Sequence, residues 1–258
     1  MEEGDPPSIV QSLAPSIGCL ALGPCAMGFF ALLGALRDTD LEPITEISGA
    51  SAGAILGLLL CLGKSVTEIF ELTIDKKFDS LVKPNLVSLV TRYGLVPMDP
   101  IKTALIELCD GQSPTFRDLK KKLYVSAFCV DTGITEYFSR DTVPDAHVID
   151  FICMSIAVPF LFESVTYRGR LYVDGGLVES VPMGPFLGRR ALALRLVPEM
   201  ERGPVSSLKS FVTRLIRSTL RSIEYEGVTS VYTDVDVFNF SMSLENRLRM
   251  FLGGTATF

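Results

Sequence analysis

The sequence predicts an α/β protein, a three-layer α/β/α sandwich around a mostly parallel central sheet. Short apolar, partly β-branched runs alternate with longer helix-compatible runs, which is typical of strands joined by helical crossovers. The strand candidates are apolar almost throughout, as in parallel sheets that helices cover on both faces. The chain of 258 residues is 48% hydrophobic and 21% charged, a composition that excludes a disordered protein and supports one large core.

The first third of the chain predicts two strand–turn–helix units in succession. Each unit begins with a short strand and continues, after a turn of small residues, into an apolar helix. The successive strands, turns and helices span residues 17–22, 23–28, 29–36, 44–48, 49–51 and 52–62. Residues 64–96 are mixed, with helical stretches interrupted at Pro84 and Gly94.

The middle of the chain predicts three more helices, a pair of adjacent strands, a hairpin and a late apolar strand. The hairpin turns at Arg168-Gly169-Arg170, and Pro159 ends the helix before it. The helices span 99–109, 115–122 and 146–157, the paired strands 123–130 and 134–139, the hairpin 167–173 and the late strand 191–197.

Residues 205–226 predict an amphipathic helix with a basic face, followed by a strand over 231–240. Apolar residues recur at helical spacing, and the basic residues occupy other positions: Lys209, Arg214, Arg217 and Arg221. This face is either solvated or lies against anionic lipid headgroups.

Two uncharged runs, residues 17–36 and 47–63, are long enough to suggest a membrane-spanning hairpin. Glycine and proline interrupt the first run five times, and buried parallel strands with their covering helices have the same composition. The chain has no Trp for an aromatic belt. We therefore favour a buried core, and the hairpin remains the alternative.

The net charge and the cysteines indicate the cellular compartment and the kind of binding partner to expect. The net charge is −6 and no zinc-binding or RNA-binding motif is present, so nucleic acid is not expected as a partner. Six cysteines without a C-x-x-C pair indicate buried, reduced thiols in an intracellular protein. The acidic N-terminus lacks the basic region of a signal peptide. We expect a cytoplasmic or peripherally membrane-associated protein.

The pentapeptide Gly49-Ala50-Ser51-Ala52-Gly53 lies between a predicted strand and a predicted helix. A G-x-S-x-G pattern in this context is that of a nucleophile elbow, in which a strained turn exposes the serine hydroxyl to a cleft. Flanking glycines permit the turn because they carry no side chain. Free N–H groups at the start of the helix can stabilise an oxyanion. Ser51 is therefore the candidate nucleophile.

A serine nucleophile needs a base, and a carboxylate is the first candidate. The single histidine, His147, lies near the start of a predicted helix with nothing to direct it toward Ser51. Asp174 ends a predicted strand and precedes Gly175 and Gly176, which let the backbone approach a cleft closely. Asp174 is therefore the candidate base, and a triad that uses His147 is the weaker alternative.

Four motifs, taken together and in this order, resemble the patatin-like phospholipases, serine acyl hydrolases with a Ser–Asp dyad. They are the Gly23–Gly28 turn, Gly49-Ala-Ser51-Ala-Gly53, Ser155-Ile-Ala-Val-Pro159 and Asp174-Gly-Gly176-Leu-Val-Glu-Ser-Val-Pro182. The similarity covers about residues 18–198. It implies an α/β/α sandwich in which Ser51 attacks an ester and Asp174 accepts its proton, without a metal or cofactor. The implied partner is a lipid substrate at a membrane surface, and no protein partner is indicated.

The glycine-rich turn departs from the family pattern, which is typically G-G-G-x-R/K-G. Here it reads Gly23-Pro24-Cys25-Ala26-Met27-Gly28, and Pro24 has no N–H to donate. The resemblance implies that backbone N–H groups of this turn and of Ala52 hold the oxyanion. The alternative function is that of a catalytically impaired relative that binds lipid or a protein.

The resemblance also suggests how the chain is divided. Residues 1–16 are expected to form a loose leader, and residues 17–198 the patatin-like hydrolase domain. Residues 199–258 would complete the same domain with a helix and a strand.

Overall fold

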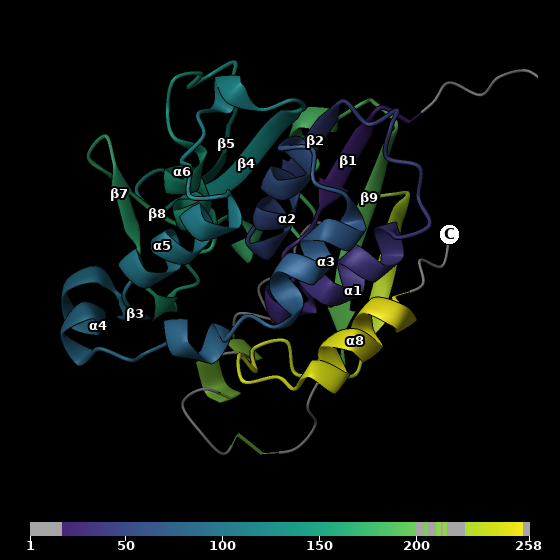
Figure 1. The fold of residues 1–258 in the computed structure, drawn as a ribbon. Helices are drawn as coiled ribbons and strands as arrows, with labels where there is room; N and C mark the ends of the chain where they lie inside the picture. The colour runs from purple at the N-terminus through teal and green to yellow at the C-terminus, as the bar shows by residue number, and fades with distance from the viewer. Residues whose placement is uncertain (1–16, 200–203, 206–209, 213, 216–224, 255–258) are drawn as a thin grey trace, which may run out of the picture.

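An eight-stranded sheet forms the centre of the molecule, in the order β10-β9-β1-β2-β4-β8-β7 with β5 on the other edge of β4. The computed structural model describes residues 17–199, 204–205, 210–212, 214–215 and 225–254 (Figure 1). The strands of this sheet are β1 (Cys19–Leu22), β2 (Glu46–Gly49), β4 (Lys122–Cys129), β5 (Ile134–Phe138), β7 (Val165–Tyr167), β8 (Arg170–Asp174), β9 (Ala191–Pro198) and β10 (Val228–Thr233).

Helices flank the sheet, and a small second sheet lies at one end of the molecule. The helices are α1 (Phe29–Leu36), α2 (Ala52–Cys61), α3 (Val66–Ile74), α4 (Leu86–Arg92), α5 (Asp99–Leu108), α6 (Val148–Ser155) and α8 (Leu244–Gly253). The second sheet pairs β3 (Gly94–Val96) with β6 (Phe160–Phe162) in parallel. Strands β10, β9, β1, β2 and β4 are also mutually parallel. The predicted α/β class with a mostly parallel central sheet is confirmed.

The register of β4 brings two distant parts of the chain together. Gly49, the last residue of β2, pairs with Val125, and Asp174, the last residue of β8, pairs with Ala127. Strand β5 also pairs with β4 at Val125 and at Ala127. It therefore lies on the edge of β4 opposite to β2 at Val125 and opposite to β8 at Ala127. Strands β2 and β8 therefore share one edge of β4. The turn that follows Gly49 must meet the end of β8.

Both uncharged runs of the sequence are part of the protein core. In β1, Leu20 and Leu22 are buried on one face of the sheet, in the large core that also holds α1, α2, α5 and α6. Cys19 and Ala21 are buried on the other face, against Val181, Met183 and Phe186. No helix within the described ranges combines the length and the hydropathy needed to cross a bilayer.

One predicted helix, over 115–122, is wrong. Only Phe116–Asp118 form a single 3-10 turn, Leu119 has an extended conformation, and strand β4 begins at Lys122. The backbone N–H of Lys120 donates to Cys61 and that of Lys122 to Thr45, which draws this segment alongside α2 and β2. These contacts with distant parts of the chain override the local helix propensity.

The carboxyl-terminal part of the chain also differs from the prediction. The last strand spans Val228–Thr233 rather than 231–240, because β9 offers no partner beyond Pro198. Of the predicted helix 205–226, residues 210–212 and 214–215 are helical, and Lys209, Arg217 and Arg221 lie outside the described residues. The expected leader, 1–16, lies outside them too. Helix α8 was not predicted.

The six cysteines are all buried and unpaired, as the sequence predicts.

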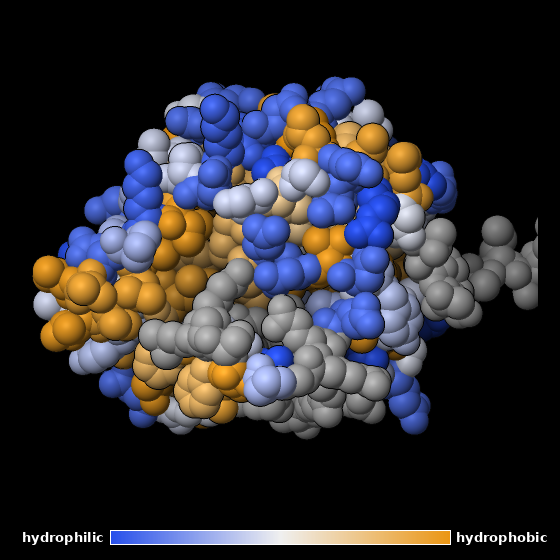
Figure 2. Space-filling model, turned by 90° about the horizontal axis from the view of Figure 1, so that it is seen from below, coloured by the Kyte–Doolittle hydropathy of each residue, from blue (hydrophilic) through white to orange (hydrophobic). Residues whose placement is uncertain are grey.

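Several large hydrophobic residues are exposed on the surface of the molecule. Figure 2 shows such residues at the end of the molecule formed by α4, continuing toward the middle of the same face.

Candidate active site

Ser51 lies on a strained turn between β2 and α2. Its backbone has φ of 56° and ψ of −134°, a conformation that side chains disfavour. A Cβ atom on Gly49 would come within 2.5 Å of Ala54 Cα, and one on Gly53 within 2.5 Å of Gly23 O. Both glycines are therefore required by close backbone packing. The arrangement is that of a nucleophile elbow.

Ser51 and Asp174 are in direct contact. Ser51 Oγ donates a hydrogen bond of 2.6 Å to Asp174 Oδ2, and both residues are buried. The other carboxylate oxygen, Oδ1, accepts a 2.7 Å hydrogen bond from the N–H of Gly176. A Cβ atom on Gly175 would lie 2.3 Å from Ser126 O, so the loop after Asp174 can approach the sheet only with glycine there.

Burial tunes the carboxyl group of Asp174 for proton transfer. Desolvation raises its pKa to about 7, and the hydrogen bonds from Ser51 and Gly176 only partly oppose this effect. A carboxylate with a pKa near neutrality can accept a proton and return it. Asp174 is therefore a candidate general base.

The Gly23–Gly28 turn contains both paired and unpaired backbone N–H groups. The N–H of Gly23 donates to Leu194 O and that of Gly28 to Cys25 O, so these two glycines shape the turn and are not free donors. The N–H groups of Cys25 and Ala26 have no hydrogen-bond partner within the described part of the chain.

A third free donor is available at the start of α2. The N–H of Ala52 likewise has no partner among the residues that the structure describes, because a helix leaves its first N–H groups unpaired. Ala26 and Ala52 line the same pocket as Ser51. These N–H groups are therefore candidate oxyanion donors.

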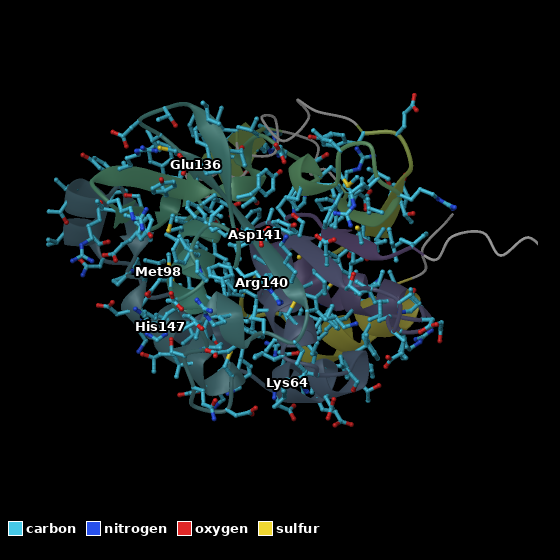
Figure 3. The ribbon with its side chains drawn as sticks, turned by 90° about the horizontal axis from the view of Figure 1, so that it is seen from above. Lys64, Met98, Glu136, Arg140, Asp141 and His147 are labelled. Atoms are coloured by element: carbon cyan, nitrogen blue, oxygen red, sulfur yellow. The ribbon has the colours of Figure 1, made fainter. Side chains whose placement is uncertain are left out.

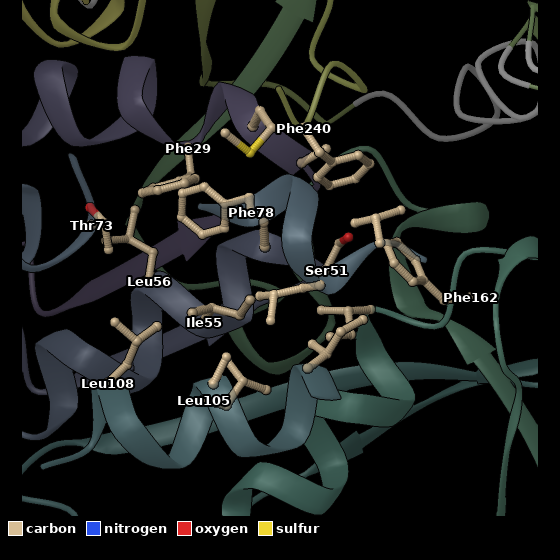
Figure 4. A pocket seen from close by; sticks show the side chains of 18 of the residues that line it. Phe29, Ser51, Ile55, Leu56, Thr73, Phe78, Leu105, Leu108, Phe162 and Phe240 are labelled. Carbon is tan, nitrogen blue, oxygen red and sulfur yellow. The ribbon is translucent and has the colours of Figure 1, made fainter. Parts of the chain in front are cut away.

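Ser51 opens into a pocket with apolar walls (Figure 4). The cavity has a volume of about 140 Å³, and among the described residues that line it only Ser51 and Thr73 are polar. Leu105 of α5 and Phe162 of β6 contribute to its walls. The further lining residues are Ala26, Met27, Phe29, Ala52, Ile55, Leu56, Leu59, Ile69, Phe78, Leu81, Val82, Ile101, Ala104, Leu108, Ile156, Val158, Phe238 and Phe240. Such a pocket suits a hydrocarbon chain.

His147 lies outside this site. It is exposed at the start of α6, and its Nδ1 atom is 2.8 Å from the carbonyl oxygen of Ser113. It is labelled in Figure 3 and is not among the residues that line the pocket. The geometry offers no role for His147 beside Ser51.

Two supporting contacts were not predicted from the sequence. The backbone N–H of Ser51 donates to Ser155 Oγ over 2.9 Å, and the N–H of Asp174 donates to Ala157 O over 3.0 Å. The end of α6 and the residues after it thus hold both members of the Ser51–Asp174 pair. The only signal was that Ser155 and Ala157 belong to one of the four recognised motifs.

Comparison with known proteins gives consistent matches. A family model described as patatin-like phospholipase matches residues 18–187. A protein of Acanthamoeba polyphaga mimivirus, described as uncharacterized, is 29% identical over 198 residues, which is 72% of this chain and 66% of that protein. A probable lipid hydrolase of Invertebrate iridescent virus 6 is 29% identical over 181 residues, which is 64% of this chain and 61% of that protein.

A solved structure shows the same fold. The crystal structure of VipD from Legionella pneumophila matches with a TM-score of 0.60 at 17% identity, over 93% of this chain and 66% of that chain. This chain spans less than two thirds of the length of each of these three proteins.

Proposed function

The chain belongs to the patatin-like phospholipase family, and on this premise we propose that it hydrolyses ester bonds of phospholipids or related acyl lipids through a Ser51 acyl-enzyme. The observation that carries the proposal is the 2.6 Å hydrogen bond from Ser51 Oγ to Asp174 Oδ2, beside an apolar pocket that Ser51 lines. The pocket would hold the acyl chain, and Asp174 would act as the base.

The first step transfers the acyl group to the enzyme. Ser51 Oγ attacks the ester carbonyl carbon while its proton passes to Asp174 Oδ2. The bond between the carbonyl carbon and the leaving oxygen then breaks, and the proton on Asp174 passes to the departing alcohol. The products are the free alcohol and an ester between the fatty acid and Ser51.

The second step returns the enzyme to its starting state. A water molecule gives a proton to Asp174 and attacks the acyl carbonyl carbon. The bond to Ser51 Oγ breaks, Asp174 returns the proton to Ser51, and a fatty acid leaves.

Backbone N–H groups support both steps by stabilising the oxyanion. The unpaired donors of Cys25, Ala26 and Ala52 are the candidates for this role. One such donor is worth about 3 to 4 kcal/mol in a well-studied hydrolase. Pro24 removes a donor that the family's usual glycine carries. The three remaining N–H groups favour hydrolysis over the alternative of a lipid-binding relative without turnover.

Release of fatty acid from phosphatidylcholine vesicles tests the proposal. We expect wild-type protein to release fatty acid, and Ser51→Ala and Asp174→Asn to lose at least about a thousandfold in rate. His147→Ala is the matched control and should keep the wild-type rate, because His147 lies outside the site. Retained turnover in Ser51→Ala would refute the mechanism. Vesicle binding by folded wild-type protein without any release would favour the lipid-binding alternative.

A further inference from the structure

Five large hydrophobic side chains stand exposed at the α4 end of the molecule and form one surface, here called the α4 patch. The members and their exposed fractions are Leu86 (74%), Val87 (69%), Val90 (78%), Tyr93 (58%) and Phe160 (53%). Leu86 and Val90 lie one turn apart on α4, Val87 lies beside them, and Tyr93 follows the last residue of the helix. An exposed cluster of this kind marks an interaction surface.

The backbone holds the two aromatic members in an unfavourable conformation. Tyr93 has φ of 61° and Phe160 has φ of 65°, in the left-handed region that bulky residues avoid. The two residues are joined by a 3.1 Å hydrogen bond from the N–H of Phe160 to the carbonyl oxygen of Tyr93. Strained residues of this type cluster at functional sites. Both strained residues carry aromatic rings that are more than half exposed.

The α4 patch rests on a rigid base. Glu163 is buried beneath it and accepts hydrogen bonds from Ser88 Oγ over 2.7 Å and from the N–H of Met98 over 3.0 Å. Its Oε2 atom also lies 3.3 Å from the guanidinium of Arg92. A Cβ atom on Gly94 would collide with Phe162 O, so α4, β3 and β6 are tightly packed. The exposed side chains therefore belong to a part of the structure that buried hydrogen bonds and close backbone packing hold in place.

The segments that precede α4, follow β3 and end β6 all contribute residues to the wall of the Ser51 pocket. Leu81 and Val82 precede α4, Ile101 follows β3, and Phe162 ends β6, and all four residues line the pocket. The hydrophobic surface in Figure 2 continues from the α4 end toward the middle of that face. The segments that carry the α4 patch therefore also form part of the wall of the Ser51 pocket.

Exposed cations lie at both ends of α4. Lys83 precedes the helix and is exposed, and the guanidinium side chain of Arg92 is 62% exposed at its end. An exposed apolar cluster that includes a tyrosine and has basic residues beside it matches the composition of a bilayer interface, where cations meet headgroup phosphates and tyrosine prefers the boundary. This composition, together with the chain segments shared with the pocket wall, favours a phospholipid bilayer as the occupant.

We propose that the α4 patch inserts into the surface of a phospholipid bilayer and so places the mouth of the pocket against its substrate. This inference rests on the proposed function, since it assigns the face that a lipid hydrolase turns toward the membrane. It differs from the basic face of residues 205–226, which the sequence suggested for that role. A lipid would then pass from the bilayer to the pocket with little exposure of its acyl chain to water.

A single introduced tryptophan tests insertion directly, because the chain contains none. In a Ser51→Ala background, which leaves the vesicles intact, we expect the emission of Val90→Trp to shift to the blue with vesicles of phosphatidylcholine and phosphatidylserine. Brominated phospholipid should quench it. The matched control is Leu248→Trp, on an exposed position of α8 that does not line the pocket. An unchanged spectrum for Val90→Trp, or equal quenching of both, would overturn the proposal.

A second pair of variants separates this inference from the proposed function. The double variant Leu86→Ser/Val90→Ser should lose at least about tenfold in vesicle affinity, because two exposed side chains no longer enter the bilayer. The control Leu248→Ser/Leu252→Ser should bind as wild type. Both should hydrolyse a soluble short-chain ester at the wild-type rate, since none of these residues lines the pocket.

The outcomes of these assays are distinguishable. If wild-type protein cleaves neither vesicles nor soluble ester, the proposed function fails, whereas the binding comparison still decides the role of the α4 patch. Equal vesicle affinity for the two double variants would overturn the inference. Self-association in sedimentation velocity that disappears in Leu86→Ser/Val90→Ser, with vesicle binding unchanged, would assign the patch to a second copy of the chain and would overturn it too.

Discussion

Pro24 packs directly against Gly176, and this contact joins the divergent turn to the loop that carries Asp174. A Cβ atom on Gly176 would lie 2.5 Å from Pro24 Cβ and 2.6 Å from Pro24 Cγ. The N–H of Gly176 donates to Asp174 Oδ1, so the loop conformation that Pro24 supports also orients the carboxylate. Pro24 removes one backbone donor from the turn, and its ring lies against the loop that carries the candidate base.

A double-mutant cycle tests this coupling. Gly176→Ala should lower the rate of hydrolysis of a soluble ester by at least about tenfold, because the new methyl group collides with Pro24 and displaces Asp174. Pro24→Gly alone should have a small effect on the rate. In the double variant the collision with Pro24 is absent and only a 3.1 Å contact with Asp174 Oδ1 remains, so we expect much of the lost activity to return. Strictly additive effects on the logarithm of the rate would show that the two positions are uncoupled.

The rate should depend on pH through the ionisation of Asp174. A general base must be unprotonated, and burial raises the pKa of Asp174 to about 7, so activity should rise with pH and reach half its maximum near pH 7. Below that value kcat/KM should fall about tenfold per pH unit. Soluble-ester kinetics measure the profile, and circular dichroism at each pH checks that the protein stays folded. A rate that stays constant down to pH 5 would contradict this assignment.

Filling the pocket should discriminate against long acyl chains. Ala104 of α5 lines the pocket, and Ala104→Phe places a ring where the acyl chain is proposed to lie. We expect kcat/KM for long-chain esters to fall much more than for short-chain esters. Thr103→Phe, at an exposed neighbouring position on the same helix, is the control. A uniform loss across chain lengths in Ala104→Phe would point to misfolding or to another binding path.

A buried arginine should stabilise the pocket wall. Arg247 of α8 donates to the carbonyl oxygens of Ile74 and Lys76 over 2.6 and 2.8 Å, and its guanidinium lies 5.2 Å from the ring centroid of Phe78. Arg247→Met leaves those carbonyl groups without their donor and should lower the free energy of unfolding by about 2 to 3 kcal/mol. Urea denaturation measures this change.

The control for this substitution lies on the same helix. Arg249 forms an exposed ion pair of 2.8 Å with Asp234, so Arg249→Met should cost less than about 1 kcal/mol. Equal losses of stability from the two variants would mean that the buried contacts of Arg247 contribute nothing specific.

Local patterns were sufficient to predict much of the fold. The apolar run 29–36 and the small residues around Ser51 predicted α1 and the elbow, because both depend on side-chain size and periodicity over a few positions. Pro159 and the Arg168-Gly169 turn likewise marked the end of α6 and the β7–β8 hairpin correctly. These features are decided by neighbours in the sequence.

Other features depend on contacts between distant parts of the chain, which local periodicity does not encode. The pairing of Ser51 with Asp174 was predicted only through the family resemblance, and its geometry follows from the register of β4. The segment 115–122 does not form the predicted helix, because the N–H groups of Lys120 and Lys122 donate to Cys61 and Thr45 instead. The apolar residues of α4 resemble those of a core helix, and only the packing of Ser88 and Glu163 shows that its hydrophobic face points outward.

The central claim is that Ser51 is a nucleophile activated by Asp174, and labelling with a fluorophosphonate probe tests it most directly. The probe reacts covalently with activated serines and needs no knowledge of the natural lipid. We expect wild-type protein and His147→Ala to be labelled, Asp174→Asn to be labelled much more slowly, and Ser51→Ala not at all. Folded wild-type protein that stays unlabelled, or labelling that persists in Ser51→Ala, would contradict the account.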